Sequence, residues 1–156
     1  MHTRFFEKIA LNGIKTASKN SSAAHDTKPL FSSDSPHLAK GMLGENTAAS
    51  YLENNGFILL GRNVRAGRCE IDIVAKDKDE IVFVEVRTRS RGWMMSASES
   101  VGPKKTANLI RAASKWTEER NYFGFWRIDL VAVTLEEGKE PAVEHIRNIT
   151  EPVKNE

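Results

Sequence analysis

The spacing between two carboxylates, Asp72 and Glu85, constrains the fold of this chain more than any other feature. Two runs of alternating, largely β-branched residues, 69–75 and 81–87, flank the charged segment 76–80, which is typical of a β-hairpin. A turn centred in the middle of that segment places Asp72 directly opposite Glu85. The sequence therefore predicts a hairpin that holds two carboxylates side by side.

The same register predicts which side chains share a face of the hairpin. Ile71 lies opposite Val86 and Ile73 lies opposite Val84, so the apolar residues share one face and the two carboxylates share the other. Like charges placed directly opposite each other destabilise a sheet. We therefore expect a cation between the two carboxylates.

Composition predicts one folded domain with an extension. The 156 residues are 40% hydrophobic, which is enough for a single domain with a core. We expect a flexible extension over 1–40, the domain over 41–150 and a tail over 151–156. The sequence contains no apolar run long enough to cross a membrane. Its single cysteine, Cys69, fits a reducing, cytoplasmic location.

The expected elements follow the order α-β-β-β-α-β-β, which favours an α/β fold with a mixed sheet and helices packed on it. Asn55-Gly56 closes the first helix and Pro103 opens the second. A short amphipathic helix is also expected within the extension. The ranges are helix 4–15, helix 42–54, strand 57–65, hairpin 69–89, helix 103–120, and strands 125–135 and 141–147.

The paired carboxylates and Arg87 form the first candidate site. Two carboxylates offer hard oxygen ligands for Mg²⁺ or Mn²⁺, and an ion so placed activates water and stabilises charge on a phosphate. The alternative is a solvated polar face on which Arg87 pairs with Glu70 opposite it. The pattern alone leaves both interpretations open.

Glu45 is the second candidate. On helix 42–54, Glu45 shares a face with Ala49 and Leu52, so it points toward the sheet. A carboxylate there could be a third metal ligand or a base that orients water. The alternative is a glutamate that favours the helix dipole in the first turn and needs no partner.

Basic residues cluster around the hairpin and at the start of the second helix. Cations of this kind contact nucleic-acid phosphates, although any other anion would serve equally well. Trp93 in the adjacent loop could stack on a base or anchor the loop. Acidic residues gather toward the C-terminus, which would leave one positive face. The predicted nucleic-acid-binding residues are Arg62, Arg65, Arg68, Arg89, Arg91, Lys104 and Lys105.

Together these segments resemble the PD-(D/E)XK nuclease superfamily, and more closely the YraN-type family of small predicted bacterial endonucleases. The resemblance implies a restriction-endonuclease-like core in which Asp72 and Glu85 are metal ligands, while Glu45 is similar to the helix glutamate of resolvase-like members. It covers about residues 41–150. It rests on Gly44-Glu45, Glu70-Ile71-Asp72, the run from Phe83 to Arg89, Lys104 or Lys105, and Arg127-Ile128-Asp129.

Two residues depart from the family pattern. Arg87 stands where the family usually has lysine, and arginine stays protonated, so it can hold a phosphate but cannot accept a proton. Cys69 stands where the family usually has glycine.

The expected function is a metal-dependent nuclease acting on DNA, with branched or repair-intermediate DNA as the expected substrate and a homodimer among the expected assemblies. The alternatives are an inactive nucleic-acid-binding module of the same fold and a protein-interaction domain that uses residues 1–40.

Overall fold

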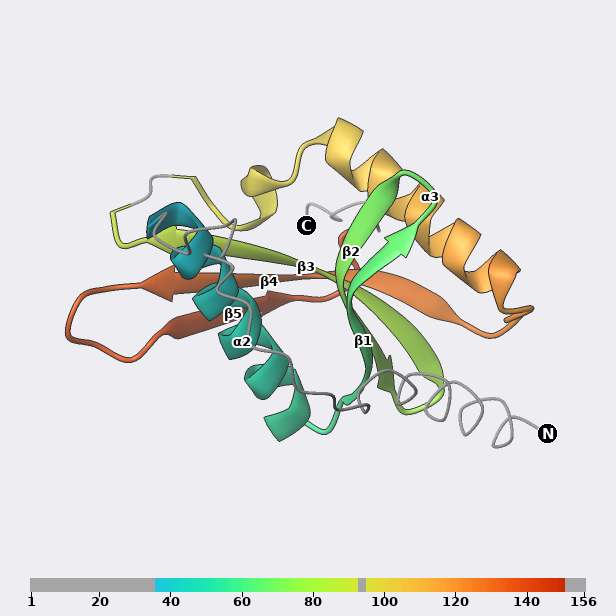
Figure 1. The fold of residues 1–156 in the computed structure, drawn as a ribbon, viewed down its shortest axis with the longest axis horizontal. Helices are drawn as coiled ribbons and strands as arrows, with labels where there is room; N and C mark the ends of the chain where they lie inside the picture. Colours follow the sequence, from blue (N-terminus) through green and yellow to red (C-terminus); the bar gives the residue numbers. More distant parts are fainter. Residues whose placement is uncertain (1–35, 93–94, 151–156) are drawn as a thin grey trace, which may run out of the picture.

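The structure is a computed structural model and describes residues 36–92 and 95–150. The helix expected at 4–15 and the loop residue Trp93 lie outside these ranges. Within them, a five-stranded sheet lies between two helices (Figure 1). The elements are α2 (Pro36–Asn54), β1 (Ile58–Ala66), β2 (Cys69–Asp77), β3 (Glu80–Ser90), the 3-10 turn η1 (Ser98–Ser100), α3 (Pro103–Glu119), β4 (Trp126–Leu135) and β5 (Ala142–Ile146).

The expected order α-β-β-β-α-β-β is confirmed, and the fold is an α/β fold consistent with a restriction-endonuclease-like core. The strands lie in the sequential order β1-β2-β3-β4-β5. β3 and β4 are parallel and α3 connects them, whereas the other neighbouring pairs are antiparallel. The sheet is therefore mixed, as predicted. None of the helices in the described ranges is long and apolar enough to cross a membrane.

The predicted hairpin register is confirmed. β2 and β3 pair from Asp77 and Glu80 to Ile73 and Val84, where the antiparallel ladder ends. β3 continues beside β4 as far as Ser90, so the two strands of the hairpin separate beyond Val84. The two carboxylates predicted to lie opposite each other come directly after this point of separation.

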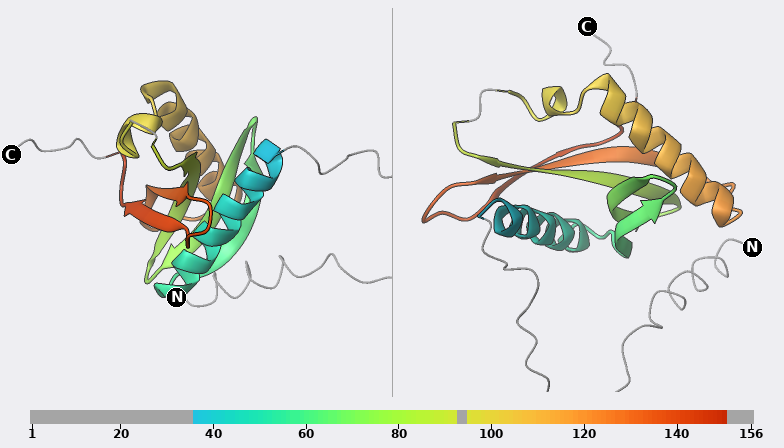
Figure 2. Two further views of the ribbon diagram at one scale, coloured as in Figure 1. Left: turned by 90° about the vertical axis from the view of Figure 1, so that its left-hand side faces the viewer. Right: turned by 45° about the horizontal axis from the view of Figure 1, so that its top comes forward.

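The prediction that one face of the hairpin is polar is wrong, because helices cover both faces. Val74 and Phe83 pack in the core beneath α3, whereas Ile73 and Val84 pack in the core beneath α2. Figure 2 shows the two helices on opposite sides of the sheet. β2 and β3 are interior strands of the sheet, and strands buried on both faces lose the simple alternation of apolar and polar residues.

Helix α2 begins at Pro36, earlier than the predicted start at 42 and ahead of the predicted domain start at 41. Proline suits the first position of a helix, and a single interior glycine such as Gly41 weakens a helix without ending it. Helix α3 agrees with its predicted range to within one residue at its end.

A glycine sets how closely α2 approaches the sheet. A Cβ atom built on Gly44 would lie 1.7 Å from the Thr88 hydroxyl oxygen and 2.8 Å from the Thr88 Cβ atom. Gly44 precedes Glu45, and Thr88 follows Arg87, so this contact holds two candidate site residues on neighbouring elements. Only glycine permits this approach.

The substitution Gly44→Ala is expected to lower the free energy of unfolding by about 1–3 kcal/mol, because the methyl group forces α2 away from β3. Gly41→Ala is the matched control, since its Cβ atom would meet no heavy atom within 4 Å. It is expected to be neutral or to stabilise the helix by up to about 1 kcal/mol. Urea unfolding measures both. Equal stabilities of the two variants would contradict the close packing.

Candidate active site

The two carboxylates of the hairpin share one pocket at the point where β2 and β3 separate. The pocket has a volume of about 390 Å³, and it is also lined by Glu45 from α2 and by Arg87 from β3. The structure therefore brings together four residues that the sequence analysis named separately. The complete lining is His37, Lys40, Gly41, Glu45, Asp72, Glu85, Val86, Arg87 and Thr88.

The environment of the pair disfavours two full negative charges. The side chain of Glu85 is only 3% exposed. Burial raises the pKa of Asp72 to about 6, and the neighbouring Glu85 charge acts in the same direction. The Val86 N–H group opposes this by donating a hydrogen bond of 2.7 Å to Asp72 Oδ2, and Lys105 also lowers the pKa. A carboxyl group with a raised pKa in a pocket is typical of a functional site.

Lys105 is the cation that lies against the pair. Its Nζ atom is 2.9 Å from Glu85 Oε2, and Arg87 Nη2 is 3.3 Å from Glu85 Oε1. Both contacts are ion pairs, yet the buried Glu85 Oε2 and Arg87 Nε atoms lack a hydrogen-bond partner of good geometry. The sequence analysis assigned Lys105 only to nucleic-acid binding. Pro103 at the start of α3 was the signal that places residue 105 in the first helical turn.

The alternative pairing of Arg87 with Glu70 is wrong. Glu70 Oε2 instead lies 3.8 Å from Arg65 Nε, across the antiparallel pair β1–β2. Arg87 remains beside Glu85 because β2 no longer pairs with β3 at that level. Arg87 therefore belongs to the pocket and not to a solvated charge ladder.

Glu45 lines the pocket from α2, whereas Lys105 reaches Glu85 from α3. Its carboxylate is 28% exposed and lies 3.9 Å from Arg62 Nη2, while Arg62 also donates a hydrogen bond of 2.8 Å to Asn46. Within residues 36–92 and 95–150, no three His, Cys, Asp or Glu side chains are grouped closely enough to hold a metal ion. Asp72, Glu85 and Glu45, which the sequence analysis predicted to be metal ligands, line one pocket without forming such a group.

A small set of oxygen ligands is compatible with magnesium. Mg²⁺ keeps several waters and is commonly held by one or two carboxylates. The buried Glu85 Oε2 atom, which has no hydrogen-bond partner, is an oxygen that a cation would satisfy. The donor set therefore fits Mg²⁺ or Mn²⁺, provided that Lys105 moves aside or shares Glu85 with the ion.

The remaining predicted nucleic-acid-binding residues do not form one cluster. Arg89 lies 3.0 Å from Glu144 and Arg91 lies 2.6 Å from Glu136, so acidic residues of the C-terminal part neutralise them. The expected separation of acidic and basic residues is wrong at these two places, because β4 and the turn to β5 lie beside the end of β3. Of the predicted nucleic-acid-binding residues, those that are exposed are Arg62, Arg65, Arg68, Arg91 and Lys104, whereas Arg89 and Lys105 are half-buried.

A second group of charges has a structural role. Arg127 Nε donates to Asp129 Oδ1 at 3.0 Å. His145 Nε2 lies 2.9 Å from Asp129 Oδ2, and the Asn148 N–H group donates to Asp129 Oδ1 at 2.9 Å. Asp129 is fully buried. These bonds tie β4 to β5 and to the segment that follows β5.

Removing the charge of Asp72 is expected to stabilise the metal-free protein. The folded-state pKa of about 6 lies above the ordinary value of 3.8, so ionised Asp72 opposes folding increasingly as the pH rises between them. Asp72→Asn should therefore raise the free energy of unfolding by about 1–2 kcal/mol at about pH 7.5 in EDTA, and this gain should vanish below about pH 4.

Asp79→Asn is the matched control for this measurement, because Asp79 lies exposed in the turn of the same hairpin. Its effect should stay within about 0.5 kcal/mol at every pH. An Asp72→Asn variant that is less stable than the native protein at neutral pH would show that the ionised carboxylate does not destabilise the folded state.

Comparison with known proteins identifies the family. The chain matches "Uncharacterised protein family UPF0102" over residues 44–133, more than half of its length. A UPF0102 protein of Oleidesulfovibrio alaskensis is 43% identical over 104 residues, which cover 64% of this chain and 50% of that protein. This chain thus matches about half the length of that relative. A UPF0102 protein of Pseudarthrobacter chlorophenolicus is 38% identical over 112 residues, covering 71% of this chain and 85% of that protein.

Among solved structures, the chain is similar to SfsA of Pyrococcus furiosus in complex with Ca²⁺, with 14% identity and a TM-score of 0.33. That similarity covers 71% of this chain and 63% of SfsA. The family match includes Glu45, the whole hairpin and α3, so it contains all four predicted catalytic residues, whereas His37, Lys40 and Gly41 of the pocket lining lie outside it. From the family match and the shared sequence with these relatives, the chain belongs to the UPF0102 family, the YraN-like family that its motifs indicated.

Proposed function

We propose that this protein is a metal-dependent endonuclease that hydrolyses phosphodiester bonds of DNA. The observation that carries the proposal is the pair Asp72 and Glu85, held in one pocket where the central strands separate, with Lys105 Nζ 2.9 Å from Glu85. Burial and repulsion from Glu85 raise the pKa of Asp72, so the ionised pair lowers the stability of the fold. We therefore attribute the pair to function and not to stability.

Asp72 and Glu85 would hold Mg²⁺ or Mn²⁺ in this pocket, and Glu45 would contact the ion through water. When bound, such an ion stabilises negative charge on the phosphate and makes a water molecule more acidic. Arg87 would bind a non-bridging phosphate oxygen, because its guanidinium group lies beside the pair and is 41% exposed.

Lys105 would supply what Arg87 cannot. A lysine amine can orient a water molecule and can exist in a neutral form, whereas arginine remains protonated. Lys105 reaches Glu85 from α3. The lysine of this centre therefore lies on a helix, whereas the family usually has its lysine on the strand, at the position of Arg87. In the proposed reaction the oxygen of a water molecule oriented by Lys105 would bond to phosphorus as the bond from phosphorus to the leaving oxygen breaks. The water would give up a proton to solvent, and the leaving oxygen would take up a proton.

A cleavage assay tests this function. Linear, nicked, flapped and four-way DNA are incubated with the native protein in Mg²⁺, Mn²⁺ or EDTA, beside Asp72→Asn and the hairpin control Asp79→Asn. We expect metal-dependent cleavage by the native protein and by Asp79→Asn, and a rate lowered by at least about 100-fold in Asp72→Asn. Cleavage that survives in EDTA, or that is equally fast in Asp72→Asn, would rule out this centre.

A DNA-binding module without cleavage is the second candidate. It is favoured by the two cations, Arg87 and Lys105, that already neutralise Glu85 in the metal-free pocket. The native protein would then bind DNA with an affinity that falls steeply with salt, yet would cleave none of the substrates. Cleavage that appears only in Arg87→Lys would also assign the native protein to this second class.

A further inference from the structure

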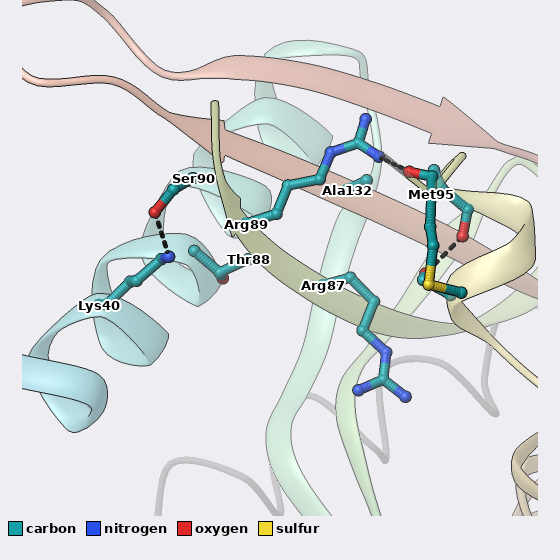
Figure 3. Close-up of a pocket in the computed structure, with 9 residues that line it drawn as sticks. Lys40, Arg87, Thr88, Arg89, Ser90, Met95 and Ala132 are labelled. Carbon is teal, nitrogen blue, oxygen red and sulfur yellow. Dashed lines mark hydrogen bonds between the residues drawn. The ribbon is translucent and has the colours of Figure 1, made fainter. Parts of the chain in front are cut away.

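A second pocket adjoins the acidic one along β3 (Figure 3). It also has a volume of about 390 Å³, and it shares Lys40, Arg87 and Thr88 with the acidic pocket. The two pockets therefore lie on consecutive stretches of the same strand. The second is lined by Lys40, Arg87, Thr88, Arg89, Ser90, Met95, Ala97, Ser100 and Ala132.

The second pocket combines an apolar wall with basic side chains. Met95 is the exposed apolar residue of the lining, whereas Ala97 and Ala132 are buried, and none of the described residues that line the pocket is acidic. Lys40 and Arg87 line the pocket from α2 and from β3. In Figure 3 the Lys40 side chain points toward Ser90, and the Arg87 side chain extends away from Ser90 and Arg89. This composition suits a ligand with one flat, apolar part and one anionic part.

Three hydrogen bonds, two from Arg89 and one from Lys40, hold this pocket in shape. Arg89 donates to Thr134 Oγ1 at 3.0 Å and to the Met95 carbonyl oxygen at 3.1 Å, which fixes the segment that carries Met95 against β3 and β4. Lys40 Nζ donates to Ser90 Oγ at 2.7 Å, which fixes the beginning of α2 against the end of β3 (Figure 3). The walls are therefore largely formed before any ligand binds, as in most small-molecule sites.

Two polar features along this part of β3 point to a ligand. Beyond Val84 the edge of β3 that faces away from β4 is no longer paired with β2. The Nε atom of Arg87 is buried and has no hydrogen-bond partner. An unsatisfied guanidinium nitrogen is a donor of the kind that binds phosphate oxygens, and so is the strand edge beyond Val86, whose own N–H group already donates to Asp72.

We infer that the second pocket binds an unpaired nucleotide next to the phosphodiester bond cleaved in the acidic pocket. The base would contact Met95, which is 45% exposed, and its phosphate would lie near Lys40 and Arg87. A base enters such a pocket only when it leaves the duplex stack, which requires unpairing energy unless the strand is already single. The inference rests on the proposed function and specifies its substrate as DNA with an unpaired arm.

Binding in EDTA tests this pocket separately from cleavage. Fluorescence anisotropy compares a labelled forked duplex that has single-stranded arms with a blunt duplex of the same paired sequence. The native protein is expected to bind the forked DNA about tenfold more tightly, because one stacked base contributes a factor of this order. Met95→Glu should abolish this preference, since a carboxylate then lines the wall that contacts the base.

Met42→Glu is the matched control, because Met42 is an exposed methionine of α2 that lines neither pocket. It should keep the tenfold preference. Lys40→Gln provides a second variant at a half-buried position of α2 and should weaken binding of the forked DNA more than that of the blunt duplex. Urea unfolding of each variant confirms that it is folded.

The results separate this inference from the proposed function. Equal affinity of the native protein for the two DNA probes, or a preference that survives in both Met95→Glu and Lys40→Gln, would overturn the nucleotide pocket even if the protein cleaves DNA. A preference lost in Met95→Glu supports the pocket, even if no DNA is cleaved and the proposed function fails.

Discussion

Replacing Asp129 with alanine is expected to lower the free energy of unfolding by about 3–5 kcal/mol, because it removes one of the partners of a buried arginine and leaves the groups that bind Asp129 unpaired. Asp129 is fully buried and binds Arg127, His145 and the Asn148 N–H group. Arg127 is itself buried and also pairs with Asp77 and Glu80. The loss therefore affects a network that joins β4 to the β2–β3 turn and to β5.

The effect of this substitution should depend on pH. Burial alone would raise the pKa of Asp129, but hydrogen bonds from His145, Asn148 and Arg127 outweigh burial and hold the pKa below its ordinary value of 3.8. The stabilisation is thus fully present above that value and is lost as the pH falls through the folded-state pKa. Urea unfolding at neutral and acidic pH measures this difference.

Asp79→Ala is the control, since Asp79 is exposed in the β2–β3 turn. It should change the free energy of unfolding by no more than about 0.5 kcal/mol. A loss in Asp129→Ala as small as in Asp79→Ala would mean that the buried charges of β4 do not support one another.

Replacing Lys105 with methionine is expected to change metal binding and cleavage in opposite directions. Lys105 lies against Glu85 in the metal-free protein, so it competes with a bound cation, and its removal should tighten Mg²⁺ binding. The same variant should cleave DNA about 100-fold more slowly or worse, because the group that orients the water is gone. Calorimetric Mg²⁺ titration and a cleavage time course provide the two measurements.

Lys104→Met is the matched control, because Lys104 is the exposed neighbour of Lys105 on the same helical turn. It should bind Mg²⁺ with native affinity and reduce cleavage only through weaker, salt-dependent DNA binding. Unchanged cleavage in Lys105→Met would show that Lys105 takes no part in the reaction, and Arg87 would then be the basic residue of the centre.

The sequence predicted the hairpin and its register because local rules decide them. β-branched residues alternate on both sides of one charged turn, and a shift of one residue would turn every side chain to the opposite face. Pro103 similarly defined the start of α3. The alternation and the turn are therefore sufficient to place Asp72 and Glu85 side by side.

Other features depend on tertiary packing and could not be predicted. Lys105 meets Glu85 only because α3 crosses over the sheet between the parallel strands β3 and β4. Arg89 and Arg91 fit the pattern of nucleic-acid ligands in the sequence, but β4 and β5 place Glu144 and Glu136 beside them. Long-range ion pairs of this kind leave no pattern in the local sequence.

The second pocket also arises from tertiary packing. Lys40, Ala97 and Ala132 belong to three segments that are far apart in the sequence and meet at the end of β3. The early start of α2 contributes as well, since Lys40 lies in the first part of that helix, which the sequence analysis assigned to the flexible extension. Buried alanines that line a pocket have no local sequence pattern that distinguishes them from other core residues.

The most direct test of the central claim is a calorimetric titration of the native protein with Mg²⁺ and Mn²⁺, beside Asp72→Asn, Glu85→Gln and Asp79→Asn. The proposed centre predicts one bound ion in the native protein and in Asp79→Asn, with affinity lowered by at least about tenfold in the two pocket variants. Native affinity in both Asp72→Asn and Glu85→Gln would contradict a metal centre at these carboxylates.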